Sequence, residues 1–300
     1  MIFIKFKDKQ PFKWLNRVYI KLSAFCVLFS FGYVIRTRNK PSFFETPILV
    51  CNHISSMDAV SIAYLHDTSF LAKHTLKKLF PANLFSKLMD TIFVDRENHK
   101  TDFFTQMEKR YGCRTDYENQ TDVDVVAATD FVLSPTTHSG DLPTVFYSKP
   151  TLIYPEGTCA NGQSLLQFKT GAFRLRMNVH VISIQYKSLF DCSTCQRKIS
   201  YVLKMFTNPL TIVHMDYLAV MKHINYTDPQ KFASACQKAI ATHQNVQTSK
   251  YSQNDFLYFF KNLKNIECTL KRQYAHIGTA KDYKCQDPYT QAIKAMNLPK

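Results

Sequence analysis

The sequence predicts an α/β fold, a mixed and largely parallel sheet flanked by helices, with an N-terminal membrane-anchoring helix in front of it. Two kinds of observation lead to this prediction. The runs Ile48–Cys51 and Thr151–Tyr154 are short, apolar and next to prolines, which is typical of strands buried on both faces. Between these apolar runs lie amphipathic stretches that begin with residues typical of a helix N-terminus. The best example begins at Asp228, which can cap a helix, followed by Pro229 in its first turn.

The first 40 residues are predicted to form a basic arm followed by the membrane-anchoring helix. Leu22–Ile35 carries no charge, but 14 helical residues rise only about 21 Å against an apolar bilayer core of about 30 Å. Extending the segment back to Val18, with Lys21 reaching the headgroups, gives 18 residues, the lower limit for spanning. Basic residues follow Ile35 in place of a cleavage site, so an uncleaved anchor, spanning or lying in one leaflet, is favoured over a core helix. The arm contains Lys5, Phe6, Lys7, Lys9, Phe12, Lys13, Trp14 and Arg17.

Residues 41–245 are predicted to form the main domain, in which helices and strands follow one another. Residues that can cap a helix stand at several predicted starts, namely Ser55 or Ser56, Asn83 and Thr101. In chain order the predicted elements are a helix from about 57 to 67, a helix at 84–89, a strand at 91–94, a helix at 101–111, a strand at 151–154, strands at 179–186 and 211–220, and a helix at 229–242.

Two parts of the chain are predicted to lie outside this framework. The stretch from about 115 to 148 is rich in aspartate, serine and threonine and contains Pro135, which is typical of a surface insertion. Residues 246–300 are polar, aromatic and basic without a recognisable motif, and are predicted to be a C-terminal extension that packs on the domain.

The chain is strongly basic, with a net charge of +15 and a pI near 9.3. This charge predicts an anionic partner, which nucleic acid, an anionic membrane surface or a phosphate-bearing substrate would each satisfy. No zinc-finger spacing, RNA-binding aromatic signature or basic heptad pattern is present, so nucleic acid is the least favoured of the three.

The nine cysteines are odd in number and scattered, which indicates reduced thiols and not a disulfide framework. Cys192 and Cys195 form a CxxC pair, but a second ligand pair with the spacing of a structural zinc site does not accompany them. We therefore predict no metal site.

The stretch from Ile48 to Asp58 holds the best candidate for chemistry. His53 follows the first buried strand, and Asp58 comes five residues later. On one continuous helix these side chains would point about 140° apart, but across a strand-to-helix turn they can meet. A carboxylate that accepts the proton of one imidazole nitrogen fixes the tautomer and leaves the other nitrogen free to act as a general base. The alternative is a loop histidine with an ordinary structural hydrogen bond.

Three later motifs favour the catalytic interpretation. The phrase NHxxxxD at 52–58 is followed by FVDR at 93–96, YPEGTC at 154–159 and FKTGAF at 168–173. In this order and spacing they resemble the glycerolipid acyltransferase superfamily, and the cysteine after EGT together with FKTGAF is most similar to its lysophosphatidylcholine acyltransferase branch. The resemblance covers about residues 45–245 and includes a strand at 70–73.

The resemblance implies a role for each motif. His53 and Asp58 would be the catalytic pair, and Arg96, whose planar donor fork suits a phosphate, would bind the acceptor. Arg96 could instead pair with a neighbouring carboxylate. The segment Glu156, Gly157 and Thr158 would bind the glycerol-phosphate part of the acceptor, and Lys169 is a second candidate for the phosphate.

Three details at these motifs qualify that assignment. Glu156 is like-charged to a phosphate, so we expect it to hold a hydroxyl or a neighbouring base. Cys159 could be read as an acylated nucleophile, but the resemblance implies direct transfer and a structural cysteine. The strand at 179–186 carries His180 and Ser183 where related sequences usually have prolines, so the shape of the pocket near it is expected to differ.

The resemblance implies transfer of an acyl group from acyl-CoA, as co-substrate, to a free glycerol hydroxyl of a lysophospholipid, without a bound cofactor. The expected partners are these two substrates and a bilayer, with the endoplasmic reticulum membrane as the expected location and no nucleic acid. Glycerol-3-phosphate or lysophosphatidic acid is the alternative acceptor. The alternative from a different class is a catalytically inactive, basic membrane-binding protein.

Overall fold

The computed structural model describes residues 12–74, 77, 82–94, 100–111, 149–194 and 198–255. At its centre is a seven-stranded sheet with the order β1-β8-β7-β2-β5-β3-β4. The strands are β1 (Tyr33–Arg38), β2 (Ile48–Cys51), β3 (Ser69–Lys73), β4 (Ile92–Val94), β5 (Thr151–Ile153), β7 (Val179–Ser188) and β8 (Thr211–Met221).

The sheet is mixed and mostly parallel, which confirms that part of the prediction. Strands β7, β2, β5, β3 and β4 run in one direction, each paired in parallel with its neighbour. Strand β8 is antiparallel to β7, and β1 pairs in parallel with β8 at the edge. The carboxyl ends of the five parallel strands therefore meet at one edge of the sheet, where α/β proteins usually place their functional groups.

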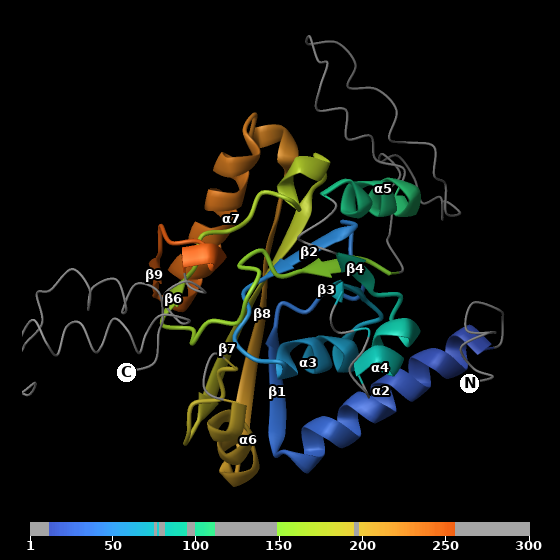
Figure 1. Cartoon of the computed structure of the whole chain (residues 1–300), viewed down its shortest axis with the longest axis vertical. Helices are drawn as coiled ribbons and strands as arrows, with labels where there is room; N and C mark the ends of the chain where they lie inside the picture. The colour runs from blue at the N-terminus through green and yellow to red at the C-terminus, as the bar shows by residue number, and fades with distance from the viewer. Residues whose placement is uncertain are drawn as a thin grey trace, which may run out of the picture.

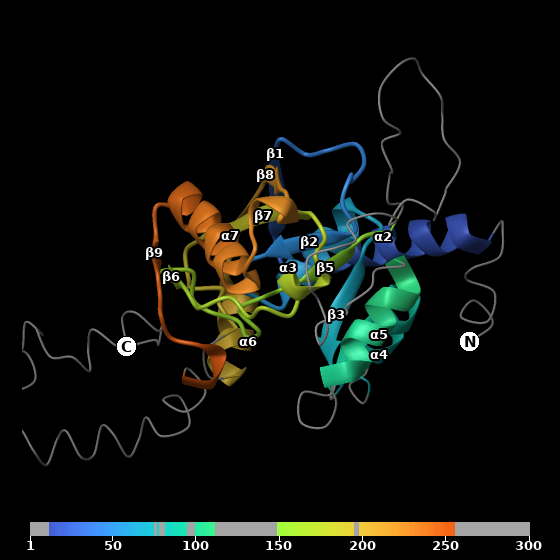
Figure 2. The same cartoon turned by 90° about the horizontal axis from the view of Figure 1, so that it is seen from above.

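Helices cover both faces of the sheet, because the buried strands are apolar on both sides. Leu49 and Cys51 of β2 belong to one core cluster, and Ile48 and Val50 to a second one on the opposite face. Figures 1 and 2 show α7 far from α2, in keeping with this division. The first cluster is shared with α2 (Phe12–Ser30), α3 (Met57–Leu65), α4 (Ala82–Leu88) and α6 (Lys198–Thr207), and the second with α5 (Lys100–Tyr111) and α7 (Pro229–Gln244).

The prediction of a membrane-spanning N-terminal helix requires correction, whereas the alternative of a helix lying in one leaflet stays a prediction. Within the described residues no helix is both long enough and apolar enough to cross a bilayer. Helix α2 ends at Ser30, and Gly32 then adopts a positive φ of 67° that turns the chain into β1. The segment up to Ile35 is thus a helix and an edge strand. The buried residues Ile20 and Leu28 of α2 belong to the core. One side of α2 is therefore a core helix, the alternative that the sequence analysis favoured less.

Helix α7 begins as the sequence predicts. The Asp228 side chain accepts a hydrogen bond from the main-chain N–H of Gln230, and Pro229 occupies the first turn. Buried Phe232, Cys236 and Ile240 lie on one face of the helix, which packs on β7. The chain then forms β9 (Gln247–Thr248), which pairs with β6 (Ser164–Leu165) in a small separate sheet that the sequence did not indicate.

Candidate active site

The candidate site lies where β2, β5 and β7 end. Asn52, directly after β2, donates from its amide to the carbonyl of Ile184 on β7 at 2.9 Å and accepts from the N–H of Ile184 at 2.8 Å. A buried glutamine of α7, Gln244, also donates to the Asn52 oxygen and to the hydroxyl of Ser183. These bonds fix the direction in which the chain leaves the sheet, and the next residue is His53.

His53 and Asp58 are in contact across the turn between β2 and α3. The distance from His53 Nδ1 to Asp58 Oδ2 is 2.8 Å. Asp58 is fully buried in the first turn of α3, where the helix dipole favours a negative charge. The spacing in the sequence predicted this contact. Catalysis by the pair stays a prediction.

Asp58 also organises the turn itself. Its Oδ2 atom accepts main-chain N–H groups from Ile54 at 2.8 Å and Ser55 at 3.0 Å, while the Tyr186 hydroxyl donates to Oδ1. Of the two serines predicted to cap α3, Ser56 stands at the cap position without a side-chain cap bond, whereas the Ser55 hydroxyl accepts the main-chain N–H of Met57 at 3.3 Å. One carboxylate therefore holds both the imidazole and the loop that carries it.

The imidazole of His53 is held in one plane. Its ring stacks on Tyr154, which follows β5, with ring centroids 4.1 Å apart and an interplanar angle of 16°. Because Nδ1 faces Asp58, the other ring nitrogen remains for proton transfer, and the side chain keeps 20% of its surface exposed. The ring is thus oriented on two sides and open to a substrate on a third.

Glu156 also holds the turn between β2 and α3 through hydrogen bonds to the main chain. Its carboxylate is 1% exposed, and its two oxygens accept the N–H of His53 at 2.9 Å and the N–H of Leu166 at 3.0 Å. Burial raises the pKa of Glu156 to about 7, although the two main-chain hydrogen bonds work in the opposite direction. The resemblance places Glu156 among the substrate-binding residues. In the structure both oxygens instead accept main-chain N–H groups, one of them that of His53, and the predicted role of Glu156 toward a substrate stays a prediction.

We expect the Glu156→Gln substitution to destabilise the fold. An amide has only one acceptor oxygen, so one of the two buried N–H groups of His53 and Leu166 would lose its partner. Leaving a buried donor unpaired costs about 1–3 kcal/mol in unfolding free energy. Equilibrium denaturation with urea at neutral pH measures this difference.

The matched control is Gln163→Glu, which makes the reverse change at an exposed position in the same loop region. It should leave the unfolding free energy within about 0.5 kcal/mol of the wild type. Equal stability of Glu156→Gln and wild type would contradict the supporting role of Glu156.

Gly157 and Lys169 come together beside this turn. Gly157 has a φ of +73°, and a β-carbon on it would lie 2.6 Å from Gln253 Oε1 and 3.1 Å from Lys169 Cε. The Lys169 ammonium donates to the Gln253 side chain, and its main-chain N–H donates to Pro155 O at 2.9 Å. The glycine is needed both for the turn and for the close approach of the lysine.

Of the two remaining predicted site residues, the structure describes Thr158 but not Arg96. Thr158 follows Gly157 and is half-buried in the same loop. Arg96 lies outside the described residues, as do the predicted insertion at 115–148, the basic arm before Phe12 and the extension beyond residue 255. Their predicted roles therefore stay predictions.

Cys159 lies close to His53. The following residue, Ala160, donates its N–H to the His53 carbonyl at 2.8 Å. Burial lowers the pKa of His53, but Cys159 and Asp58 both favour the protonated ring, and together they raise the pKa well above its usual range. The cysteine that the resemblance implies to be structural is thus next to His53 and affects its protonation.

Three further residues at the site escaped the sequence analysis. The Tyr186 hydroxyl donates to Asp58, and the Tyr154 ring stacks on His53. The hydroxyl of Tyr201, on α6, is hydrogen-bonded to Ser56 Oγ at 2.7 Å. Tyr154 and Tyr186 close predicted strands, so their place at the sheet edge was a usable signal. Nothing in the sequence indicated α6 or the contact of Tyr201.

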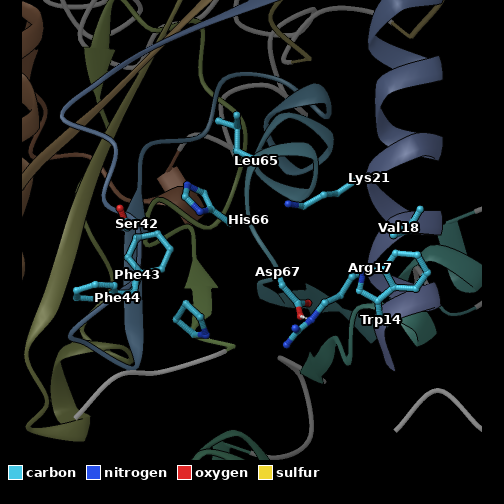
Figure 3. Close-up of a pocket in the computed structure, with 11 residues that line it drawn as sticks. Trp14, Arg17, Val18, Lys21, Ser42, Phe43, Phe44, Leu65, His66 and Asp67 are labelled. Atoms are coloured by element: carbon cyan, nitrogen blue, oxygen red, sulfur yellow. Dashed lines mark hydrogen bonds and ion pairs between the residues drawn. The ribbon is translucent and has the colours of Figure 1, made fainter. Parts of the chain in front are cut away.

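A pocket of about 470 Å³ lies elsewhere, beyond the opposite end of α3 (Figure 3). Arg17 and Lys21 of α2 and His66 contribute to its walls, and none of the predicted site residues does. Burial, and then the neighbouring lysines, lower the pKa of His66 to about 4. In the described part of the chain no group of three or more His, Cys, Asp or Glu side chains could hold a metal ion.

Comparison with known proteins gives the family of this chain. Residues 35–187 match the family model described as Acyltransferase. The chain belongs to the acyltransferase family, and its relatives place it in the glycerolipid acyltransferase superfamily, as the four motifs predicted.

Two similar proteins are plant enzymes. The chain is 26% identical over 255 residues to the lysophospholipid acyltransferase LPEAT2 of Arabidopsis thaliana, a match that covers 83% of this chain and 41% of that protein. It is 27% identical over 213 residues to LPEAT1 of the same plant, covering 69% of this chain and 47% of LPEAT1. The chain thus spans less than half the length of these relatives.

A third relative and one solved structure complete the comparison. Glycerol-3-phosphate acyltransferase 3 of Homo sapiens is 33% identical over 96 residues, which are 31% of this chain and 22% of that enzyme. The crystal structure of the 1-acyl-sn-glycerophosphate acyltransferase PlsC of Thermotoga maritima aligns with a TM-score of 0.51 and 15% identity, covering 80% of this chain and 82% of PlsC. At this identity the structural likeness concerns the fold.

Proposed function

We propose that this chain transfers a fatty acyl group from acyl-CoA to a free glycerol hydroxyl of a lysophospholipid. The observation that carries the proposal is the contact of His53 with the buried Asp58 at the carboxyl edge of the sheet, inside the matched family segment. The names of the two plant relatives support a lysophospholipid as the acceptor.

In the proposed reaction, His53 takes the proton of the acceptor hydroxyl as its oxygen attacks the thioester carbonyl carbon. Asp58 accepts the hydrogen bond of the resulting imidazolium and stabilises its charge. The tetrahedral intermediate collapses with cleavage of the C–S bond, and coenzyme A leaves as a thiolate that takes up a proton. A thiolate is a good leaving group, so the site requires a base but little acid assistance.

The acceptor phosphate is proposed to bind at Lys169 and Arg96. The Lys169 side chain packs against Gly157, and the residue before Gly157, Glu156, accepts the main-chain N–H of His53. Lys169 is therefore linked to the proposed base through two neighbouring residues. Holding the phosphate there would orient the hydroxyl toward the imidazole and make the encounter effectively intramolecular. Arg96, from the FVDR motif, is assigned on the family resemblance.

Glycerol-3-phosphate or lysophosphatidic acid is the second candidate acceptor. It is favoured by the match to the human glycerol-3-phosphate acyltransferase, which has the highest identity of the three relatives, although over the shortest segment. Both candidates use the same base and the same donor. They differ in the headgroup that the pocket accepts.

The proposed setting is a membrane surface, with the endoplasmic reticulum as the expected membrane on family resemblance alone. The net charge of +15 supports attraction to anionic lipid. A catalytically inactive membrane-binding protein remains the competing class. It has no chemical reason to keep the His53–Asp58 contact intact.

One experiment tests the reaction and the acceptor together. The purified full chain is incubated with oleoyl-CoA, and thiol release is measured with a panel of lysophospholipids, lysophosphatidic acid and glycerol-3-phosphate. Acceptor-dependent release identifies the reaction, and the preferred acceptor decides between the two candidates. Retention on anionic vesicles without release for any acceptor would overturn the enzyme proposal in favour of the membrane-binding class.

The pH dependence of this reaction should reveal the effect of Cys159 on the pKa of His53. The base acts as neutral imidazole, so the rate falls as pH drops through the pKa of His53, which is raised. In the Cys159→Ala variant the pKa of His53 should be lower, so the acid limb of the pH–rate profile should move to lower pH. Cys26→Ala, an exposed cysteine on α2, is the control. An unmoved acid limb in Cys159→Ala would contradict the assignment.

A further inference from the structure

An exposed apolar surface lies between β7 and β8, on the side of the sheet edge where the candidate site lies. It is formed by the segment that leaves β7, by helix α6 and by the start of β8, and we call it the α6 apolar surface. Large apolar side chains are exposed here that a protein in water would normally bury. Its residues are Leu189, Phe190, Val202, Leu203, Phe206 and Leu210.

The surface is continuous. Phe190 and Asn208 exchange two hydrogen bonds, of 2.8 and 3.1 Å, which hold the loop after β7 against the end of α6. Phe206 makes an edge contact with Phe31, at a centroid distance of 5.0 Å, which joins α6 to the end of α2. Figure 1 shows α6 beside the point where α2 leads into β1.

The same segment is attached to the catalytic turn. The Thr194 N–H donates to the Ile54 carbonyl at 3.0 Å, and the Thr194 hydroxyl accepts from Ser56 N–H at 2.8 Å. The Tyr201 hydroxyl contacts both Ser55 and Ser56, which lie between the two members of the His53–Asp58 pair. Whatever the outer face of α6 binds is therefore held close to the base.

The charge around the surface indicates the kind of partner. Lys204 of α6 stands in the sequence between the exposed residues Leu203 and Phe206. An exposed apolar area with a lysine within it, on a chain of net charge +15, matches a bilayer with anionic headgroups.

We propose that the α6 apolar surface docks on an anionic phospholipid bilayer and holds the catalytic turn at the depth of the lipid headgroups. The proposal rests on the proposed function in one respect, that a lysophospholipid acceptor has to be taken from a membrane. Leu203 and Phe206 enter the boundary between headgroups and acyl chains, while Lys204 of the same helix contacts anionic headgroups. Docking then brings the acceptor hydroxyl to the side of His53 that is open.

Vesicle binding by the full chain tests the surface directly. The triple variant Leu189→Ser, Leu203→Ser, Phe206→Ser removes side chains that are 72%, 60% and 68% exposed, so the fold should be retained. Its affinity for vesicles of phosphatidylcholine and phosphatidylserine should fall at least about tenfold, since each large apolar side chain withdrawn from lipid weakens binding. Ile224→Ser, with a side chain 65% exposed beyond the far end of β8, should bind as the wild type does.

A fluorescence experiment locates the contact and does not depend on catalysis. Trp14 is the chain's single tryptophan, so Trp14→Phe combined with Leu203→Trp gives one reporter on α6. Vesicles that contain brominated phospholipid should quench it and shift its emission to the blue. The matched reporter Ile224→Trp should remain unquenched.

The outcomes separate this proposal from the proposed function. Wild-type vesicle affinity of the triple variant, or an unquenched reporter at position 203, overturns the docking surface. Loss of binding in a chain that transfers no acyl group supports the surface and overturns the proposed function. With a short-chain lysophospholipid dispersed as monomers, the triple variant should keep the wild-type rate of thiol release. A wild-type dimer that the triple variant breaks, with unchanged vesicle affinity, would assign the surface to a second copy of the chain.

Discussion

The His53→Ala variant is expected to release thiol from oleoyl-CoA roughly 100 to 10,000 times more slowly than the wild type, the range that a positioned general base contributes. The expectation follows from geometry. The ring is fixed by Asp58 at 2.8 Å and by stacking on Tyr154, and its free nitrogen is the proton acceptor of the proposed site. Acceptor-dependent thiol release, measured at saturating oleoyl-CoA, gives the ratio of the two rates.

The fold should survive this change, because Glu156 and Ala160 bond the main chain of His53 and not its ring. A circular dichroism melt of the variant checks that point. His223→Ala removes a histidine at the opposite edge of the sheet and should keep the wild-type rate. Partial recovery of His53→Ala by added imidazole would support the role of base. A His53→Ala rate within a few-fold of the wild type would remove His53 from the mechanism and leave the reaction without a base.

The turn that carries His53 could be predicted because its information is local. An apolar strand, a histidine and an aspartate five residues later are sufficient to place the pair on a strand-to-helix turn, and the structure brings them together. The capped start of α7 at Asp228 is local in the same way. Short-range hydrogen bonds and fixed helical spacing are properties of the sequence itself.

The N-terminal segment could not be predicted from composition. The charge-free run from Leu22 to Ile35 is compatible with a membrane helix, a core helix or a strand, because hydropathy reports that a segment avoids water but not what covers it. Gly32, with its positive φ, divides the run into α2 and β1. The pairing of β1 with β8 joins residues about 180 positions apart, which no local pattern contains.

The surroundings of the base show the same limit. Tyr186 reaches Asp58 across 128 residues of chain, and Gln253 reaches Lys169 across 84. Such contacts depend on the register of the assembled sheet and on the path of the chain after α7. The motifs identify the groups that would react, but the groups that orient them become visible only in the fold.

The Asp58→Asn variant should retain the fold and lose roughly 10- to 100-fold in rate, since a hydrogen bond to a charged group is worth about 1.5–3 kcal/mol. If the asparagine oxygen takes the place of Oδ2, it still accepts from His53, Ile54 and Ser55. The amide then faces the Tyr186 hydroxyl, which can rotate and accept. What disappears is the negative charge that stabilises the imidazolium during proton transfer.

Measurement of rate, pH profile and stability together distinguishes this charge effect from a structural one. Without the carboxylate the pKa of His53 should be lower, so the acid limb of the pH–rate profile should move to lower pH while the maximal rate falls. Tyr186→Phe retains the charge of Asp58 and should have the smaller effect on rate. Asp58→Ala leaves several donors unpaired and should be less stable than Asp58→Asn. Should Asp58→Asn keep the wild-type rate and profile, Asp58 would serve only to hold the turn, and His53 would act without electrostatic support.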